Sequence, residues 1–192
     1  MSEKPTYLGL LNAIAVAETR AHCYLSAWAE TTASDDVRAV LRTVAAREGE
    51  HGMSFAKRIS ELGFHVRTTD DPNFDKTMTV VKSNRSDLQK MKALKLHKLD
   101  TGDQPDIFDG IFRDHSIDIA TGALLGRYIA EERDSGRRLR SCYEQLKAAH
   151  DSPQSGAEPA FAGLESKVDA LCRAVEELRQ IVCAQTMTAT PQ

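Results

Sequence analysis

Three long segments of the chain share one pattern, in which a glutamate interrupts the apolar stripe of an amphipathic helix. They cover about residues 5–32, 34–63 and 117–149. In each, apolar side chains recur three and four positions apart, which places them on one face of an α-helix. The stripe positions are Leu11, Ile14, Ala21, Leu25 and Trp28; Val37, Leu41, Val44, Phe55, Ile59 and Leu62; and Leu124, Leu125, Tyr128, Leu139, Cys142 and Leu146. No strand-like alternation of any length appears, so the sequence predicts an all-α fold.

The interrupting glutamates are Glu18, Glu48 and Glu132, and a histidine, His51, follows Glu48 by three positions. An unpaired ionised carboxylate in a dry interface costs several kcal/mol, so these groups must be paired or bind a metal. Residues three apart project from the same side of a helix, so Glu48 and His51 can reach one ion together. Iron and manganese accept such a mixture of oxygen and nitrogen ligands, with no thiolate needed.

One glutamate per helix with a Glu-x-x-His motif is the ligand pattern of ferritin-like dimetal bundles. Residues 7–62, with AVAETRAHCYLSAWAE and AAREGEHGMSFAKRISELG, resemble the first helix hairpin of the ferritin-like superfamily, rubrerythrin-like branch. The last long segment, with LLGRYIAEERDSGRRL, resembles that family less closely.

The resemblance implies a ferritin-like four-helix bundle in which Glu18, Glu48 and His51 bind metal and Glu48 bridges two ions. It also implies two irons, with manganese as the alternative, and ferroxidase or peroxide- and dioxygen-linked oxidoreductase activity. The sequence itself identifies no catalytic residue, substrate or redox partner.

The second half of the chain departs from the family pattern. Glu132 is followed three positions later by Ser135 instead of a histidine. Glu131 and Asp134, one step round the helix, would be an all-carboxylate substitute if the helix turned slightly. Four residues before position 117 are alternatives for the ligand of a further helix: Asp106, Asp109, Asp114 and His115.

The alternative function is a metal-free, degenerate ferritin-like bundle that acts as a structural or interaction module. In that case the buried glutamates pair with cations such as Arg20 or Arg47. We expect Tyr24 and Tyr128 to fill the core, with hydrogen bonding to the site as the other role. Polar positions off the stripes, His22 and Glu50, are expected at the surface.

The connections are less regular than the long helices. Ser34 and Asp35 are expected to cap the second helix, and Gly63 to end it. Residues 65–85 read as a long connection with about one helical turn. The sequence predicts short helices at residues 86–99 and 106–116. In the first, the inward residues are Leu88, Met91 and Leu99, whereas Lys90, Lys92, Lys95 and Lys98 form a solvated face.

Composition divides the chain into a bundle at 1–150, a flexible linker at 151–163, a heptad helix at 164–184 and a disordered tail at 185–192. The heptad positions are Leu164, Val168, Leu171, Val175, Leu178 and Val182. Valine at a and leucine at d favour a parallel dimer, while Ala174 and Ile181 leave a trimer or tetramer open. We therefore expect a homo-oligomer through residues 164–182, in which this helix forms a coiled coil.

The charge, the apolar runs, the first residues and the cysteines of the sequence indicate which classes of protein to expect. The formal net charge is -3, which argues against a nucleic-acid binder. No apolar run approaches the roughly 18 residues of a membrane span. The first residues lack the pattern of an export signal. The four cysteines have no Cys-x-x-Cys spacing, as expected for reduced thiols in a cytoplasmic protein.

Overall fold

The computed structural model describes residues 4–99, 108 and 110–152, and these residues form helices without any strand. The three long helices are α1 (Leu8–Ala29), α2 (Asp35–Glu61) and α5 (Ile119–Asp151). Two shorter α-helices, α3 (Pro72–Lys82) and α4 (Asp87–Ala93), and two 3-10 turns, η1 (Leu96–Lys98) and η2 (Ile111–Arg113), connect them. The all-α prediction is confirmed for this part of the chain. The predicted linker, heptad helix and tail lie outside the described residues, except for positions 151 and 152.

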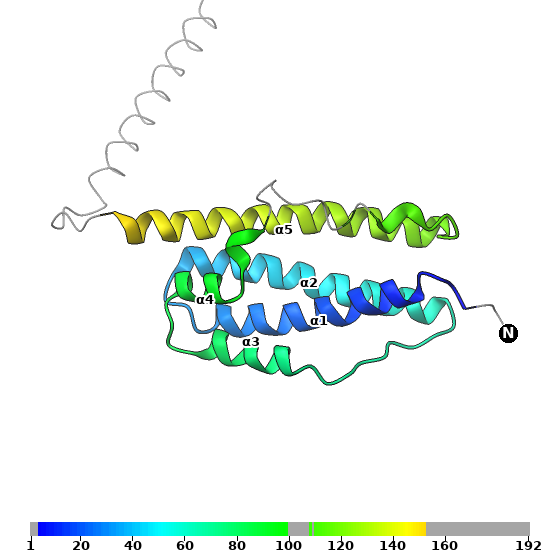
Figure 1. Cartoon of the computed structure of the whole chain (residues 1–192), viewed down its shortest axis with the longest axis horizontal. Helices are drawn as coiled ribbons and strands as arrows, with labels where there is room; N and C mark the ends of the chain where they lie inside the picture. Colours follow the sequence, from blue (N-terminus) through cyan, green and yellow to red (C-terminus); the bar gives the residue numbers. More distant parts are fainter. Residues whose placement is uncertain (1–3, 100–107, 109, 153–192) are drawn as a thin grey trace, which may run out of the picture. The chain divides into compact units, whose positions relative to one another are not determined.

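α1 and α2 form the hairpin that the sequence predicts. The side chain of Ser34 accepts a hydrogen bond from the Val37 amide, so Ser34 is the N-cap and Asp35 begins the helix. Gly63 follows the last turn of α2 at a φ of +85°, a left-handed conformation that glycine adopts without a steric penalty. The short loop between the two helices makes them antiparallel neighbours (Figure 1).

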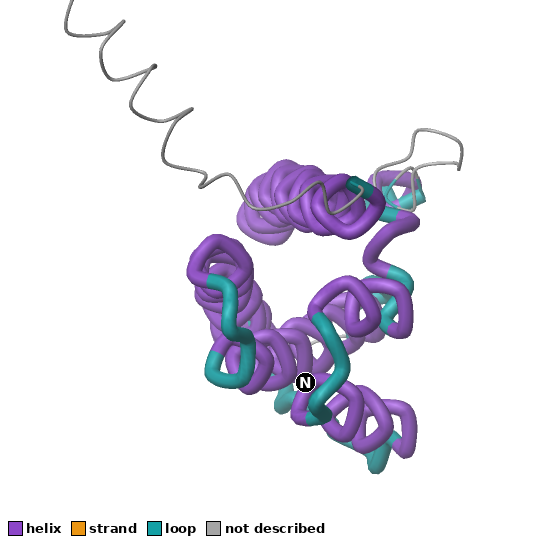
Figure 2. Tube along the Cα trace, turned by 90° about the vertical axis from the view of Figure 1, so that its left-hand side faces the viewer, coloured by secondary structure: helices purple, strands orange, loops and turns teal. Residues whose placement is uncertain are grey.

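α5 packs against α2, and α3 packs against α1 on the other side of the hairpin (Figures 1 and 2). α5 begins where Asp118 accepts hydrogen bonds from the Thr121 amide at 3.1 Å and the Thr121 hydroxyl at 2.7 Å. The same carboxylate accepts from the Tyr7 hydroxyl, at 2.7 Å, and from Arg58, at 2.9 Å. Asp118 therefore ties the starts of α1 and α5 to the end of α2.

The prediction of an irregular connection with one helical turn at residues 65–85 was wrong, because α3 occupies eleven of these positions. Asp71 caps α3 by accepting from the Asn73 amide at 2.9 Å, and Pro72 takes the first helical position. A capping aspartate followed by proline is a helix-start signal, which was present in the sequence. The predicted helix at 86–99 is divided into α4 and η1, because Lys95 adopts a left-handed φ of 58° between them.

The lysine face predicted for residues 90–98 was wrong at Lys90, which is 2% exposed. Its ammonium group donates to the Thr31 hydroxyl at 3.3 Å. Asp87, one turn earlier on α4, accepts from Trp28 Nε1 and from the Thr32 hydroxyl, each at 2.6 Å. Polar contacts therefore fix α4 against the end of α1, and Lys90 is part of that contact.

The hydrophobic core consists of two clusters along the long helices. One contains the start of α1, the end of α2 and the start of α5, with Leu11, Phe55 and Leu125 fully buried. The other contains the end of α1, the start of α2 and the end of α5, with Leu25, Leu41 and Leu139. α1 and α5 thus run in the same direction and α2 in the opposite one. Glu18, Glu48 and Glu132 all fall between the two clusters in sequence.

Candidate metal centre

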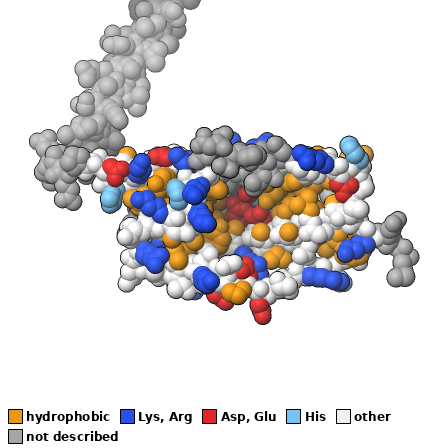
Figure 3. All heavy atoms as spheres, viewed as in Figure 1, with side chains coloured by type: hydrophobic (Ala, Val, Ile, Leu, Met, Phe, Trp, Pro, Cys, Tyr) orange, Lys and Arg blue, Asp and Glu red, His pale blue; other side chains and the backbone are white. Residues whose placement is uncertain are grey.

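A layer of polar side chains separates the two apolar clusters at mid-length of the long helices. Glu18 on α1, Glu48 and His51 on α2, and Glu132 on α5 lie in this layer. Figure 3 shows acidic side chains between two groups of hydrophobic ones on the face that it presents. Each helix supplies its polar residue from the stripe that also supplies its apolar contacts, so packing of the apolar residues brings the polar ones together.

Two glycines on α2 allow the hairpin to close tightly at this layer. A Cβ atom on Gly52 would lie 2.7 Å from the Thr19 hydroxyl and 3.2 Å from the Thr19 amide nitrogen. A Cβ atom on Gly49 would lie 2.9 Å from the ring of His22. All three distances are shorter than a normal contact. At Gly52 one of the neighbours is backbone, so a larger residue there would push α1 away from α2. The glycines therefore bring Glu18 within reach of Glu48.

The four residues Glu18, Glu48, His51 and Glu132 each offer one ligand atom, and these atoms all lie within 4.8 Å of one another. Nδ1 of His51 is 3.6 Å from Glu48 Oε2 and 3.2 Å from Glu132 Oε1. Glu18, Glu48 and His51 are buried, and the Glu132 side chain is 20% exposed. The structure thus brings together the four residues that the sequence singled out.

Three atoms of this group are buried without a hydrogen-bond partner: Glu48 Oε2, His51 Nδ1 and Glu132 Oε1. His51 Nδ1 lies within ion-pair distance of each of the two carboxylate oxygens, yet neither approach forms a hydrogen bond. Leaving a buried polar atom without a partner costs about 1–3 kcal/mol, and more for a charged one. A cation within this group would satisfy all three atoms at once.

The imidazole of His51 is oriented by a further residue of α5. Nε2 of His51 lies 2.7 Å from Glu131 Oε2. Arg127 donates to the other oxygen of Glu131 at 2.9 Å and also pairs with Glu50 on α2. With a proton on Nε2 shared with Glu131, a bound cation would displace the proton on Nδ1 and use the lone pair of that nitrogen, on the side of Glu48 and Glu132. Carboxylates orient metal-binding histidines in this way in many metalloproteins.

Two tyrosines border the layer. The hydroxyl of Tyr128 donates to Glu18 Oε1 at 2.8 Å, and its ring meets His51 edge-on with centroids 5.1 Å apart. The expectation that Tyr128 only fills the core was therefore incomplete. Burial, with the charges of Glu48 and Glu18, raises the pKa of Tyr24 to about 12.

Protons neutralise part of the charge when no cation is bound. Burial, with the neighbouring Glu48, raises the pKa of Glu18 to about 9, although the Tyr128 hydroxyl acts against this. Burial alone would lower the pKa of His51, but the carboxylates of Glu132, Glu48 and Glu131 outweigh it and raise that pKa to about 10. Burial alone would raise the pKa of Glu48, but its contact with His51 holds that pKa below the usual value.

Other residues proposed from the sequence lie elsewhere. Glu131 contacts His51 from outside the group of four. Asp134 is bound by Arg47 at 3.0 Å and by Arg138 at 2.7 Å. Asp114 accepts hydrogen bonds from Ser116 and from Thr6, which precedes α1. His115 is exposed, and Asp106 and Asp109 lie outside the described residues.

The arginines expected as alternative partners bind other residues. Arg20 donates to Asp71 at 3.0 Å and to the Thr69 carbonyl. Arg47 donates to Asp134 and Ser135 on α5. Among the described residues, neither arginine forms an ion pair with Glu18 or Glu48. The alternative in which Arg20 or Arg47 neutralises the buried glutamates is therefore not found among these contacts.

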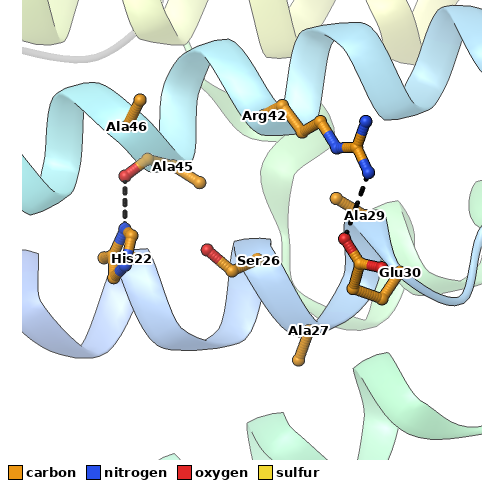
Figure 4. A pocket seen from close by; sticks show the side chains of 8 residues that line it. All are labelled: His22, Ser26, Ala27, Ala29, Glu30, Arg42, Ala45 and Ala46. Carbon is orange, nitrogen blue, oxygen red and sulfur yellow. Dashed lines mark hydrogen bonds and ion pairs between the residues drawn. The ribbon is translucent and has the colours of Figure 1, made fainter.

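A separate pocket of about 330 Å³ lies between α1 and α2 (Figure 4). Alanines and Ser26 line it together with His22, whose Nδ1 is 2.7 Å from the Ala45 carbonyl, and with the Arg42–Glu30 ion pair. His22 and Glu50 are both exposed, as expected. None of the four residues of the polar layer lines this pocket.

Comparisons of the chain with family models, with curated proteins and with solved structures find no match. Among the helices of the described residues, none is long and apolar enough to cross a membrane.

Proposed function

We propose that this chain is a ferritin-like helical protein that binds iron or manganese through Glu18, Glu48, His51 and Glu132. The single observation that supports this most strongly is the group of three buried, unpartnered atoms, Glu48 Oε2, His51 Nδ1 and Glu132 Oε1. They come from two helices, are buried between apolar clusters, and lie close enough for one ion to contact all of them.

The donor set favours these metals over others. Three carboxylates and one imidazole provide hard oxygen ligands with one nitrogen, which suits Fe²⁺ and Mn²⁺. Structural zinc sites usually contain thiolates, and the two cysteines among the described residues, Cys23 and Cys142, are not part of the group. A divalent cation would also replace the protons that Glu18 and His51 carry in its absence.

Iron held in such a carboxylate site would supply electrons to dioxygen or peroxide, which is the chemistry of ferroxidases and related oxidoreductases. The surrounding residues have distinct roles in this proposal. Glu131 holds the proton of His51 Nε2, so that Nδ1 is available to the metal. Tyr128 holds Glu18 through its hydroxyl. The apolar clusters on both sides limit the access of water to the layer.

A second candidate function is a metal-free bundle that acts as a structural or interaction module. The observation that favours it is the charge state of the layer without a cation, since a protonated Glu18 and a charged His51 partly neutralise Glu48 and Glu132. In that case, the protons remain in place whether or not metal is supplied, and the function lies in contacts with other chains.

The metal content of the purified full-length protein separates the two functions. The protein is produced in cells supplied with iron or manganese, and bound metal per chain is measured by inductively coupled plasma mass spectrometry. We expect metal in the wild type and none in Glu48→Gln, with helical circular dichroism unchanged. Glu50→Gln is the matched control, because Glu50 is an exposed neighbour on the same helix that pairs with Arg127. Equal metal content in all three proteins, or none in any, would reject the proposal.

A further inference from the structure

Ferritin-like dimetal sites require a second Glu-x-x-His motif, whose histidine would follow Glu132 by three positions on α5. The residue at that position is Ser135, which is 2% exposed. The groups around Ser135 therefore determine whether a second ion could bind next to Glu132.

Arg47 already places a positive charge at this position. Its Nη1 atom lies 3.1 Å from the Ser135 hydroxyl, 3.0 Å from Asp134 Oδ2 and 3.0 Å from the main-chain oxygen of Glu131. Arg47 directly precedes Glu48 on α2, and its guanidinium group reaches α5 beside Ser135. Ser135 follows Glu132 by about one helical turn. A guanidinium is charged at every relevant pH, so a second cation beside Ser135 would meet electrostatic repulsion.

The remaining carboxylates of this part of α5 are also engaged, by arginines and by the imidazole of His51. Glu131 contacts His51 Nε2 at 2.7 Å and Arg127 at 2.9 Å. Asp134 contacts Arg138 at 2.7 Å and Arg137 at 3.6 Å, in addition to Arg47. Recruiting either carboxylate to a metal would break charged contacts that connect α2 to α5 or brace α5.

We infer that the polar layer binds one divalent cation per chain instead of two, with Arg47 and Ser135 occupying the position of the second ion. This inference rests on the proposed function, and it concerns the number of ions and the residues that set it. One divalent cation bound by three carboxylates and a neutral imidazole leaves one excess negative charge.

The test is a titration of the metal-depleted full-length protein with Mn²⁺, followed by isothermal calorimetry and by electron paramagnetic resonance. We expect one equivalent to bind, with the hyperfine pattern of an isolated Mn²⁺ ion. Two equivalents with an exchange-coupled spectrum would overturn the inference and leave the proposed function intact. No binding at this layer would reject the proposed function itself.

A pair of variants on α5 tests the assignment of residues. Glu132→Gln should weaken Mn²⁺ binding by at least tenfold, because it removes a ligand charge. Asp134→Asn should retain one equivalent and affinity within about threefold, because Asp134 belongs to the Arg47 contact. Circular dichroism checks that both variants are folded. A lower stoichiometry in Asp134→Asn, with the helices intact, would show that Asp134 binds an ion and would overturn the inference.

Discussion

Nε2 of His51 on α2 lies 2.7 Å from a carboxylate oxygen of Glu131 on α5. This contact directs Nδ1, the other nitrogen of the ring, toward Glu48 and Glu132. The two residues are distant in sequence, so the orientation of the imidazole depends on how α5 packs against α2. The arrangement of the proposed ligands is therefore a property of the tertiary fold and not of the Glu-x-x-His motif alone.

Removing Glu131 should weaken metal binding without removing a ligand. We expect Glu131→Ala to lower Mn²⁺ affinity by about 10–100-fold, because the imidazole loses the group that fixes its tautomer and orientation. Glu131→Gln should lose less, since its amide oxygen still accepts from Nε2. Calorimetry measures the affinity, and ¹⁵N NMR of the imidazole reports which nitrogen carries the proton. Glu144→Ala is the control, because Glu144 pairs with Arg140 elsewhere on α5. Equal affinities for Glu131→Ala and this control would contradict the role of Glu131.

Gly52→Ala should destabilise the hairpin at the polar layer. The added methyl group would lie 2.7 Å from the Thr19 hydroxyl and 3.2 Å from a backbone nitrogen that cannot turn aside. We expect the free energy of unfolding to fall by roughly 1–3 kcal/mol, which exceeds the gain in helix propensity. Gly126→Ala provides the comparison, because nothing lies within 4 Å of its added Cβ. That variant should gain about 0.5–1 kcal/mol. Urea unfolding of both proteins measures the difference, and a stabilised Gly52→Ala would show that α1 and α2 are not closely packed here.

Asp118 should make the stability of the protein sensitive to acid. Hydrogen bonds from Tyr7, Thr121 and Arg58 hold the pKa of this carboxyl group well below its usual range, although burial acts against them. A lowered folded-state pKa contributes stability above the unfolded pKa, about 3.9, and that contribution is lost as the pH falls toward the folded value. We expect the free energy of unfolding of Asp118→Asn to be lower than that of the wild type by roughly 1–2 kcal/mol at neutral pH.

The difference between Asp118→Asn and the wild type should shrink between about pH 4 and about pH 2, because the wild type loses the same interactions by protonation. Asp70→Asn, at an exposed position of the α2–α3 connection, should follow the wild type throughout. A constant difference across this pH range would mean that the charge of Asp118 contributes nothing to stability.

Deleting residues 164–192 should lower the oligomeric state and leave metal binding unchanged. These residues lie outside the described part of the chain, and the prediction comes from the heptad pattern. Each leucine or valine buried in a coiled coil contributes roughly 1.5–3 kcal/mol before ordering costs, which is enough in sum to drive association. In the full-length protein, Leu171→Glu at a d position should have the same effect as the deletion, whereas Arg173→Glu at an f position should not. Light scattering measures the mass, and an unchanged mass for the deletion variant would show that the heptads do not hold the oligomer together.

The sequence predicted the parts of the fold that depend on local periodicity. The stripes of Leu11, Leu41 and Leu125 are buried as expected, and Ser34 caps α2. The same stripes identified the glutamates of the polar layer, because a carboxylate on an apolar face is visible from spacing alone. Convergence of these residues then follows from packing three such stripes against one another.

Features that depend on contacts between distant segments could not be predicted in this way. Lys90 was assigned to a solvated face because its charge is normally exposed, but the end of α1 covers it and Thr31 accepts from it. Predicting the roles of Glu131 and Tyr128 would have required the orientation of α5 about its own axis. The spacing of apolar residues does not determine that orientation. α3 was missed for a different reason, since its cap at Asp71 was visible in the sequence but its apolar period is short.

The most direct test of the proposed metal site is a crystal structure of the full-length protein grown with Mn²⁺, with anomalous data collected near the manganese absorption edge. The proposal predicts one anomalous peak per chain at coordination distance from Glu18, Glu48, Nδ1 of His51 and Glu132, with Glu131 still beside Nε2. Absence of a peak in this layer at saturating Mn²⁺, or a peak bound by other residues, would contradict it.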